Sequence, residues 1–251
     1  MRAVRTEHAS AAMVVIGNEI LSGKVRDTNS PFLASQLREL GVSLERLITI
    51  PDDVDVIAET VRTYAEAYDY VFTSGGVGPT HDDVTMQGIA GAFDVDVEEH
   101  EELSALIRRA VGDGVTPIHL KMAQAPAGAR LVDAEESAFP TVAIANVFIL
   151  PGIPELFEAK IVSMRERFRA RPYHLREVLV SKNEAEIAEF LDATLDAFPE
   201  LLLGSYPKLG EARYQVRLTL ESKDKSYVDL ALADLMERMP DSYVVEVVGL
   251  E

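Results

Sequence analysis

The 251-residue sequence contains no cysteine, which excludes disulfide bonds and thiolate metal sites. Basic residues are few, with 24 Lys and Arg against 42 Asp and Glu, so the formal net charge is −18. This charge disfavours nucleic acid and anionic membrane surfaces as partners. A small phosphorylated ligand remains compatible with it, because salt screens distant charges over a Debye length of about 8 Å.

Long hydrophobic runs are also missing. The apolar stretch 141–149 is interrupted by Asn146 and followed by Pro151, so it is too short to span a bilayer. The N-terminal apolar run is interrupted by Asn18 and Glu19, and no small-residue cleavage site follows it, so it does not fit a secretory signal. We therefore expect a globular protein of the cytoplasm.

The first two-thirds of the chain alternate apolar strand-like runs with helix-like segments. Near-continuous apolar strands between helices predict an α/β fold with a doubly wound, mostly parallel sheet covered on both faces. Gly41 stands where a glycine commonly ends a helix. Strands are expected at 13–16, 44–50, 70–73 and 142–150, and helices at 28–40, 54–68, 83–93, 101–111 and 154–168.

The rhythm changes after the basic, proline-containing segment 167–174. We expect a domain boundary there, with a nucleotide domain at 1–172 and a smaller α+β satellite domain at 173–251. The satellite has the order βαββαβ, which is the ferredoxin-like arrangement. Its strands are predicted at 177–180, 201–206, 213–220 and 244–248, and its helices at 184–198 and 226–239.

The segment VFTSGGVGPTHDDVT, residues 71–85, places glycines directly after a predicted strand. Ligands of open parallel sheets gather beyond the carboxyl ends of strands. Glycines allow positive φ and convergence of N–H groups on an anion, and the following helix adds its positive N-terminus. The segment matches neither a P-loop nor the dinucleotide motif Gly-x-Gly-x-x-Gly. The alternative is a tight turn in which Asp82 or Asp83 caps the helix.

The two aspartates in this segment raise an electrostatic problem. A phosphate about 4 Å from a carboxylate is repelled by roughly 4 kcal/mol at an effective dielectric constant of 20. The partial positive charge of a helix N-terminus stabilises a nearby anion by only about 0.3–1 kcal/mol. A divalent ion such as Mg²⁺, Mn²⁺ or Co²⁺, bridging carboxylate and phosphate oxygens, would offset the repulsion. The pattern therefore predicts glycines for phosphate and aspartates for a metal ion or an attacking water.

Three further strand ends point to the same edge of the sheet. Segment 16–29 offers Asn18, Glu19, Asp27 and Asn29, segment 50–57 offers Asp52 and Asp53, and segment 150–157 offers Gly152 and Pro154. Alternatives stay open at each: a solvated Glu19, a helix cap at Asp52 or Asp53, and a plain capped turn after residue 150.

With these residues the sequence resembles a known family. The segments GNEILSGKVRDTN, IPDD, TSGGVGPTHDDVT and LPGIPELF occur in order over residues 13–160. They resemble the molybdopterin-binding-like domain shared by molybdenum-cofactor biosynthesis proteins and the N-terminal part of the CinA proteins. The segments LGSYP and YQVRLTLES extend the resemblance to the N-terminal half of eukaryotic-type FAD synthase, over nearly the whole chain.

The resemblance implies roles for particular residues. The glycines of 75–78, with Thr80, would bind the phosphate of the ligand, and Asp52 and Asp83 match two functional acidic positions of the adenylyltransferase branch. Asn18 stands where many relatives have aspartate. The expected catalytic residues are Asp52, Asp82 and Asp83, and the expected metal ligands are Asp83 and Glu19. The expected ligand-binding residues are Gly17, Asn18, Glu19, Asn29, Ser74, Gly75, Gly76, Val77, Gly78, Thr80, Thr85, Pro151, Gly152, Pro154 and Glu155.

The resemblance also implies an activity, namely metal-dependent hydrolysis of the diphosphate bond of FAD or ADP-ribose. The Ser-Gly-Gly-x-Asp-Ser motif of the synthase half does not occur in this sequence, so we do not expect it to synthesise FAD alone. Two alternatives are adenylyl transfer to molybdopterin and a non-catalytic module that binds a pterin or flavin nucleotide. Domains of this kind associate, so we expect a homo-oligomer, a dimer before a trimer.

Overall fold

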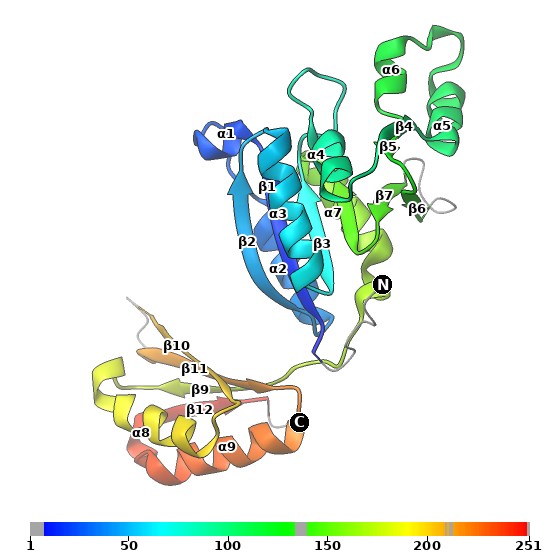
Figure 1. The fold of residues 1–251 in the computed structure, drawn as a ribbon. Coiled ribbons are helices and arrows are strands. Elements are labelled where there is room, and N and C mark those ends of the chain that lie inside the picture. The colour runs from blue at the N-terminus through cyan, green and yellow to red at the C-terminus, as the bar shows by residue number, and fades with distance from the viewer. Residues whose placement is uncertain (1–7, 134–139, 209, 211–212, 250–251) are drawn as a thin grey trace. The chain divides into compact units, whose positions relative to one another are not determined.

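A computed structural model describes residues 8–133, 140–208, 210 and 213–249 of the chain (Figure 1). The chain divides into two compact units, residues 1–171 and residues 172–251. The first unit carries the strand ends to which the sequence analysis assigns a ligand site.

The first unit is built on a six-stranded sheet with the order β2-β1-β3-β8-β7-β6. Strands β1, β2, β3 and β8 run parallel to one another, whereas β7 pairs antiparallel with both β8 and β6. The predicted α/β fold with a mostly parallel sheet is confirmed. The strands are β1 (Ser10–Ile16), β2 (Ser43–Ile50), β3 (Tyr70–Ser74), β6 (Arg130–Val132), β7 (Thr141–Ile144) and β8 (Val147–Leu150).

The prediction of one strand over 142–150 is wrong. This segment is the hairpin β7–β8, which turns at Ala145 with a φ of 49°. The side-chain amide of Asn146 fixes the turn by donating to the carbonyl oxygens of Ala65 (3.0 Å) and Tyr68 (2.9 Å). Both strands of the hairpin are buried throughout, so their apolar residues form one continuous run in the sequence.

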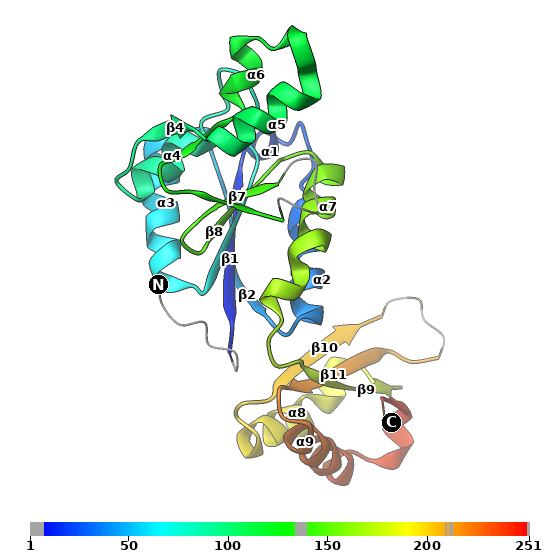
Figure 2. The same cartoon turned by 90° about the vertical axis from the view of Figure 1, so that its right-hand side faces the viewer.

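Helices cover both faces of this sheet, as a doubly wound fold requires (Figures 1 and 2). Met13 and Val15 of β1 pack toward α2 and α7, whereas Val14 and Ile16 pack toward α3 and α4. Because both faces of the inner strands β1, β3 and β8 are covered by helices, these strands are apolar without alternation, whereas the outer strand β2 has exposed residues in its middle. The helices are α2 (Asn29–Glu39), α3 (Val54–Ala67), α4 (Thr85–Ala92) and α7 (Pro154–Met164).

A segment of short helices and strands outside the six-stranded sheet, which we call the arm (residues 97–126), follows α4. Only its first helix is predicted by the sequence analysis. Figures 1 and 2 show α5 and α6 beyond the same end of the sheet as the short helix α1 (Asn18–Leu21). The arm contains β4 (Val97–Glu99), α5 (Glu101–Val111), a 3₁₀ turn (Gly112–Gly114), α6 (Pro117–Lys121) and β5 (Gln124–Pro126), with β4 and β5 antiparallel.

The second unit has the predicted βαββαβ order and a four-stranded antiparallel sheet ordered β10-β11-β9-β12. Its helices begin at side-chain caps, Asn183 for α8 and Asp224 for α9. None of the helices within the described residues is long and apolar enough to cross a membrane. The elements are β9 (His174–Val180), α8 (Glu184–Ala197), β10 (Leu202–Pro207), β11 (Val216–Ser222), α9 (Lys225–Arg238) and β12 (Val244–Val248).

Candidate functional site

The carboxyl ends of the four parallel strands meet at one edge of the sheet. The backbone N–H of Gly17 donates to the carbonyl of Ile50 at 3.1 Å, which joins the ends of β1 and β2. The N–H of Gly75 donates to the carbonyl of Leu150 at 3.2 Å, which joins the ends of β3 and β8. Ligand sites of open α/β sheets lie at this edge.

Glycine is required at two positions of the loop after β3, which we call the glycine loop (residues 75–83). Gly75 has a φ of +104°, and a Cβ there would lie 2.1 Å from the carbonyl oxygen of Ile16. Gly76 has a φ of +65°, and a Cβ there would lie 2.3 Å from Oγ1 of Thr85. The Thr85 hydroxyl is buried and donates to the carbonyl of Gly75 at 2.8 Å. Thr85, which is predicted to bind the ligand, therefore holds the glycine loop through a buried hydrogen bond.

Three successive backbone N–H groups of the loop are free. The N–H groups of Gly76, Val77 and Gly78 have no acceptor among the residues that the structure describes. Such runs of unpaired N–H groups form anion-binding concavities. The N–H of Gly75, by contrast, donates to the carbonyl of Leu150. Of the glycine segment predicted to bind an anion, only residues 76–78 therefore have free N–H groups.

Neither loop aspartate caps the following helix. Helix α4 begins at Thr85 after Val84, whose side chain cannot accept a hydrogen bond, so the capping alternative is wrong. Oδ2 of Asp83 accepts instead from the N–H of Thr80 at 2.7 Å, and the Thr80 hydroxyl lies between Asp83 and Asp82. The hydrogen bond from Thr80 lowers the pKa of Asp82 below its ordinary value, with smaller contributions from His81 and Lys121. Asp82 is thus charged at neutral pH.

The pair Asp52 and Asp53 divides between two roles. Asp53 is the N-cap of α3, and its carboxylate accepts from the N–H groups of Asp55 and Val56, both at 3.0 Å. Oδ2 of Asp52 accepts from the N–H of Asn18 at 2.7 Å, at an exposed position. The capping alternative therefore holds for Asp53, and Asp52 faces α1.

Asn29 connects the end of β3 to the end of β8. Its side-chain amide donates to Oγ of Ser74 and to the carbonyl of Gly152, both at 2.9 Å. Its buried Oδ1 has no partner among the described residues. Gly152 approaches so closely that a Cβ there would lie 3.3 Å from Cα of Gly75. Helix α7 starts with Pro154, as predicted.

These side chains line three neighbouring hollows. The Asn29 cleft, of about 80 Å³, includes Glu19, Arg26, Asn29, Ser74, Gly75 and Pro154. The loop cleft includes Gly76, Val77, Gly78, Asp83, Gln87 and Lys121. The acidic cleft, an open hollow of about 570 Å³, includes Asn18, Glu19, Lys24, Asp52 and Asp82.

The two predicted metal ligands do not share a cleft, since Glu19 lies with Asp52 and Asp82 whereas Asp83 lines the loop cleft. In the part of the chain that the structure describes, no three carboxylate or imidazole groups are grouped to hold a metal ion. Of the remaining predicted residues, Pro151 accepts from Oγ of Ser74 at 3.3 Å, and Glu155 lies exposed in the first turn of α7.

Three cations at this edge are missing from the predicted site. Lys24 lines the acidic cleft and Arg26 the Asn29 cleft, and neither pairs with any residue that the structure describes. Lys121 reaches in from the arm, and its ammonium group donates to the carbonyls of Pro79 (3.3 Å) and Thr80. Lys24 and Arg26 lie inside the motif GNEILSGKVRDTN, so their positive charge within a predicted ligand segment is a signal that the sequence contains. Lys121 follows Thr80 by 41 residues, and the sequence gives no sign of the contact.

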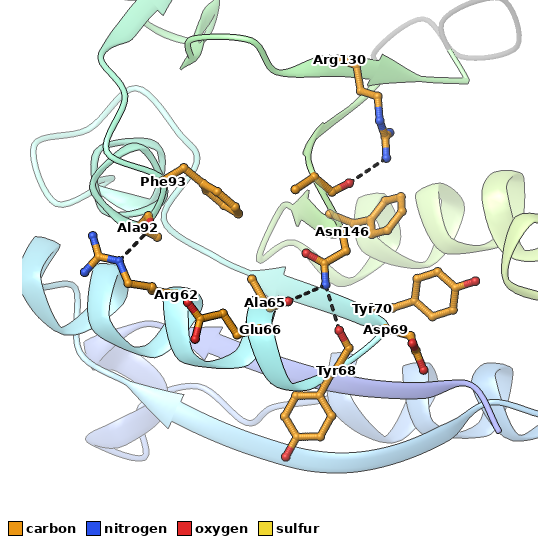
Figure 3. A pocket seen from close by; sticks show the side chains of 12 residues that line it. Arg62, Ala65, Glu66, Tyr68, Asp69, Tyr70, Ala92, Phe93, Arg130 and Asn146 are labelled. Atoms are coloured by element: carbon orange, nitrogen blue, oxygen red, sulfur yellow. Dashed lines mark hydrogen bonds between the residues drawn. The ribbon is translucent and has the colours of Figure 1, made fainter. Parts of the chain in front are cut away.

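A pocket of about 330 Å³ lies at the opposite end of the sheet (Figure 3). Its lining includes Tyr70 at the start of β3 and Asn146 in the β7–β8 turn. Arg130 donates to the carbonyl of Ala145 at 3.1 Å. None of the predicted site residues, all of which lie in the described part of the chain, lines this pocket.

Comparison with known protein families matches both units of the chain. The family described as "Probable molybdopterin binding domain" matches residues 12–168. The chain belongs to this family. The family described as "FAD synthase, middle domain" matches residues 172–248, so the resemblance predicted from the sequence motifs is confirmed for both units.

Individual relatives extend the family match. A probable FAD synthase of Caenorhabditis briggsae is 32% identical over 92% of this chain, and a CinA-like protein of Myxococcus xanthus is 31% identical over 88% of it. The chain spans about half of each, namely 50% and 56% of their lengths. A solved structure of the protein CinA from Thermoplasma acidophilum is 34% identical and superposes with a TM-score of 0.59, covering 64% of this chain and 98% of that one.

Proposed function

We propose that this chain binds a nucleotide diphosphate such as FAD or ADP-ribose at the carboxyl edge of the first sheet and hydrolyses its diphosphate bond. The observation that carries the proposal is the run of free N–H groups at residues 76–78, which line a cleft together with Lys121. Relatives named as FAD synthases, which match over 92% of this chain, support a flavin nucleotide as the ligand.

Charge at the site supports phosphate binding despite the nearby aspartates. A cation about 4 Å from a phosphate attracts it by roughly 4 kcal/mol at an effective dielectric constant of 20, which matches the repulsion by one carboxylate at that distance. Lys24 stands in the cleft that holds Asp52 and Asp82, and Lys121 in the cleft that holds Asp83. The loop cleft therefore has one cation for one carboxylate, whereas Lys24 offsets only one of the three carboxylates of the acidic cleft, Glu19, Asp52 and Asp82.

A divalent ion fits this chemistry in part. Glu19, Asp52 and Asp82 offer the hard carboxylate oxygens that Mg²⁺ and Mn²⁺ prefer, but they are not grouped as a complete ligand set. Phosphate oxygens of the nucleotide would have to complete the coordination, with Glu19 and Asp82 as the protein ligands. Such an ion would neutralise charge that develops on the diphosphate.

Asp52 is the residue best placed to orient water. One of its oxygens is fixed by the N–H of Asn18, and its other oxygen remains to accept a proton from water. In the hydrolysis, the water oxygen bonds to one phosphorus and the bond from that phosphorus to the bridging oxygen breaks. The bridging oxygen leaves with the other phosphate, and the water proton passes to Asp52. FAD would give FMN and AMP.

A second candidate is nucleotide or molybdopterin binding without hydrolysis. Two observations favour it: the match of residues 12–168 to a molybdopterin binding domain, and the lack of a grouped carboxylate set in the described chain. Adenylyl transfer to molybdopterin would use the same phosphate-binding loop.

The test incubates the purified chain with FAD, ADP-ribose or ATP and with Mg²⁺, Mn²⁺ or Co²⁺, and separates the products. We expect cleavage of FAD or ADP-ribose, and a loss of at least about 100-fold in rate for Asp52→Asn. Asp53→Asn is the matched control, because asparagine caps a helix nearly as well as aspartate. Binding without cleavage would favour the second candidate, and no binding of any nucleotide would contradict both.

A further inference from the structure

The loop cleft continues onto the arm. Lys121 and Gln124 line the loop cleft and also line an open groove of about 530 Å³ between α6 and Glu99 of β4. The floor of this groove includes Pro117, Ile118 and Leu120, which we call the apolar shelf. The residues with free N–H groups and an apolar surface thus line two adjoining hollows that share Lys121 and Gln124.

The shelf is presented at a defined place beside the glycine loop. Helix α6 begins with Pro117 in its first turn, and the side chains of Thr116 and His119 form a capping box there. At its other end, Lys121 ties α6 to the carbonyls of Pro79 and Thr80. Lys121 therefore links the helix that carries the shelf to the glycine loop.

Ile118 is an exposed residue of the shelf, with 56% of its surface accessible. A large apolar side chain next to phosphate-binding groups suits a ligand with one charged part and one flat apolar part. Three side chains offer far less surface than the roughly 800 Å² per partner of a standard protein interface. The area favours a small molecule over a second protein.

From this continuity we infer that the apolar shelf binds a planar heterocyclic ring of the nucleotide whose phosphate lies on residues 76–78. The inference rests on the proposed phosphate site and adds a second contact region to it. The shelf would make the chain selective for dinucleotides over ligands that carry phosphate without a ring. FAD carries a planar ring at both ends, so either of its two orientations would place a ring on the shelf.

The test measures binding of FAD and of inorganic pyrophosphate to the full chain by calorimetry. Ile118→Ser should weaken FAD binding about fivefold, the value for roughly 40 Å² of apolar contact at about 25 cal/mol per Å². Binding of pyrophosphate should stay unchanged, because the ligand has no ring. Val162→Ser is the matched control, since Val162 is 53% exposed on α7 and lines none of the clefts described above.

The outcomes separate the shelf from the phosphate site. If the parent chain binds pyrophosphate and FAD but Ile118→Ser binds FAD equally well, the shelf assignment is wrong and the phosphate site stands. If Ile118→Ser loses pyrophosphate together with FAD, Ile118 supports the loop and does not contact a ring, which also overturns the inference. If the parent chain binds neither ligand, the proposed function and the shelf fail together.

Discussion

The two ends of the first sheet differ in how their polar groups are used. At the amino end, the pocket of about 330 Å³ is bordered by Asn146, Arg62 and Arg130, and each donates to backbone carbonyls of its own surroundings. At the carboxyl end, the Asn29 cleft has a volume of only about 80 Å³. It is nevertheless lined by the Oδ1 of Asn29, which has no partner among the described residues, and by Arg26, which pairs with none of them.

This difference shows that concavity and readiness to bind are separate properties. The amino-end pocket has a volume suited to a ligand, but the side chains named above already donate to backbone carbonyls of its wall. The carboxyl-end groups leave hydrogen-bonding capacity unused, which a ligand can satisfy. Substitutions at the amino end should therefore change stability, and those at the carboxyl end should change binding.

The largest expected effect is at Gly76. Gly76→Ala places a Cβ against Thr85 and keeps a φ of +65°, so we expect a loss of roughly 2–4 kcal/mol in stability and at least tenfold in FAD affinity. The matched control is Gly128→Ala, where φ is +78° but no atom lies within 4 Å. It should cost only about 1–2 kcal/mol and leave FAD binding intact. Thermal unfolding and calorimetry measure both, and equal effects of the two variants would contradict this view of the loop.

Two asparagines test the comparison directly, because each donates two hydrogen bonds at one end of the sheet. Asn146→Ala should lower stability by about 1–3 kcal/mol, since the carbonyls of Ala65 and Tyr68 lose their donor, and should leave FAD affinity unchanged. Asn29→Ala should lower stability by a similar amount and also weaken FAD binding several-fold. Loss of FAD affinity in Asn146→Ala would break the distinction between the two ends.

A smaller effect is expected at the unpaired cations. Arg26→Gln and Lys24→Gln should each weaken FAD binding about fivefold at low salt, and less at high salt because ions screen exposed charges. Stability should not change, since neither side chain pairs with any described residue. Arg130→Gln is the control at the other end, where loss of the bond to Ala145 should lower stability and spare affinity. An unchanged affinity in both lysine and arginine variants would remove these cations from the site.

The smallest effect concerns the pKa of Asp82. The hydrogen bond from Thr80 lowers this pKa below 3.8, so the bond favours the charged carboxylate and is lost as the pH falls through the folded-state pKa. Thr80→Val removes that bond and should raise the pKa of Asp82 toward 3.8. An NMR titration of the Asp82 carboxyl carbon measures the change. FAD binding by the parent chain should show no transition from Asp82 between pH 5 and 8, and a shift to lower pKa in Thr80→Val would contradict the assignment.

Much of the first unit could be predicted because its strands and glycines leave strong signals. Apolar runs such as the one at residues 70–73 mark buried parallel strands, and the edge where they end follows from the topology. The hairpin at Ala145 was missed because its turn carries few turn residues and depends on Asn146 reaching back to α3. Helix α6, Pro117–Lys121, is too short to show a helical period.

The site was predictable in position and less so in assignment. The pair Asp52 and Asp53 could not be divided by sequence, because either aspartate can cap the same helix, and only the backbone geometry selects Asp53. Asp82 and Asp83 are neighbours in the sequence, but they line two different clefts, and the Thr80 hydroxyl lies between their carboxylates. Lys121 enters through a tertiary contact that no local pattern encodes.

The arm has a consequence for how this protein family can diversify. The arm follows α4 and is one part of the connection between β3 and β8, two strands that pair with each other, as Ser74 and Leu150 do. The entropy of closing such a loop grows only with the logarithm of its length, and a doubling costs only about 0.6 kcal/mol. Insertions and deletions in the arm therefore change the stability of the sheet little, although they change the surface beside the glycine loop. A change in the length of the arm therefore alters the surface beside the glycine loop while the α/β core stays the same.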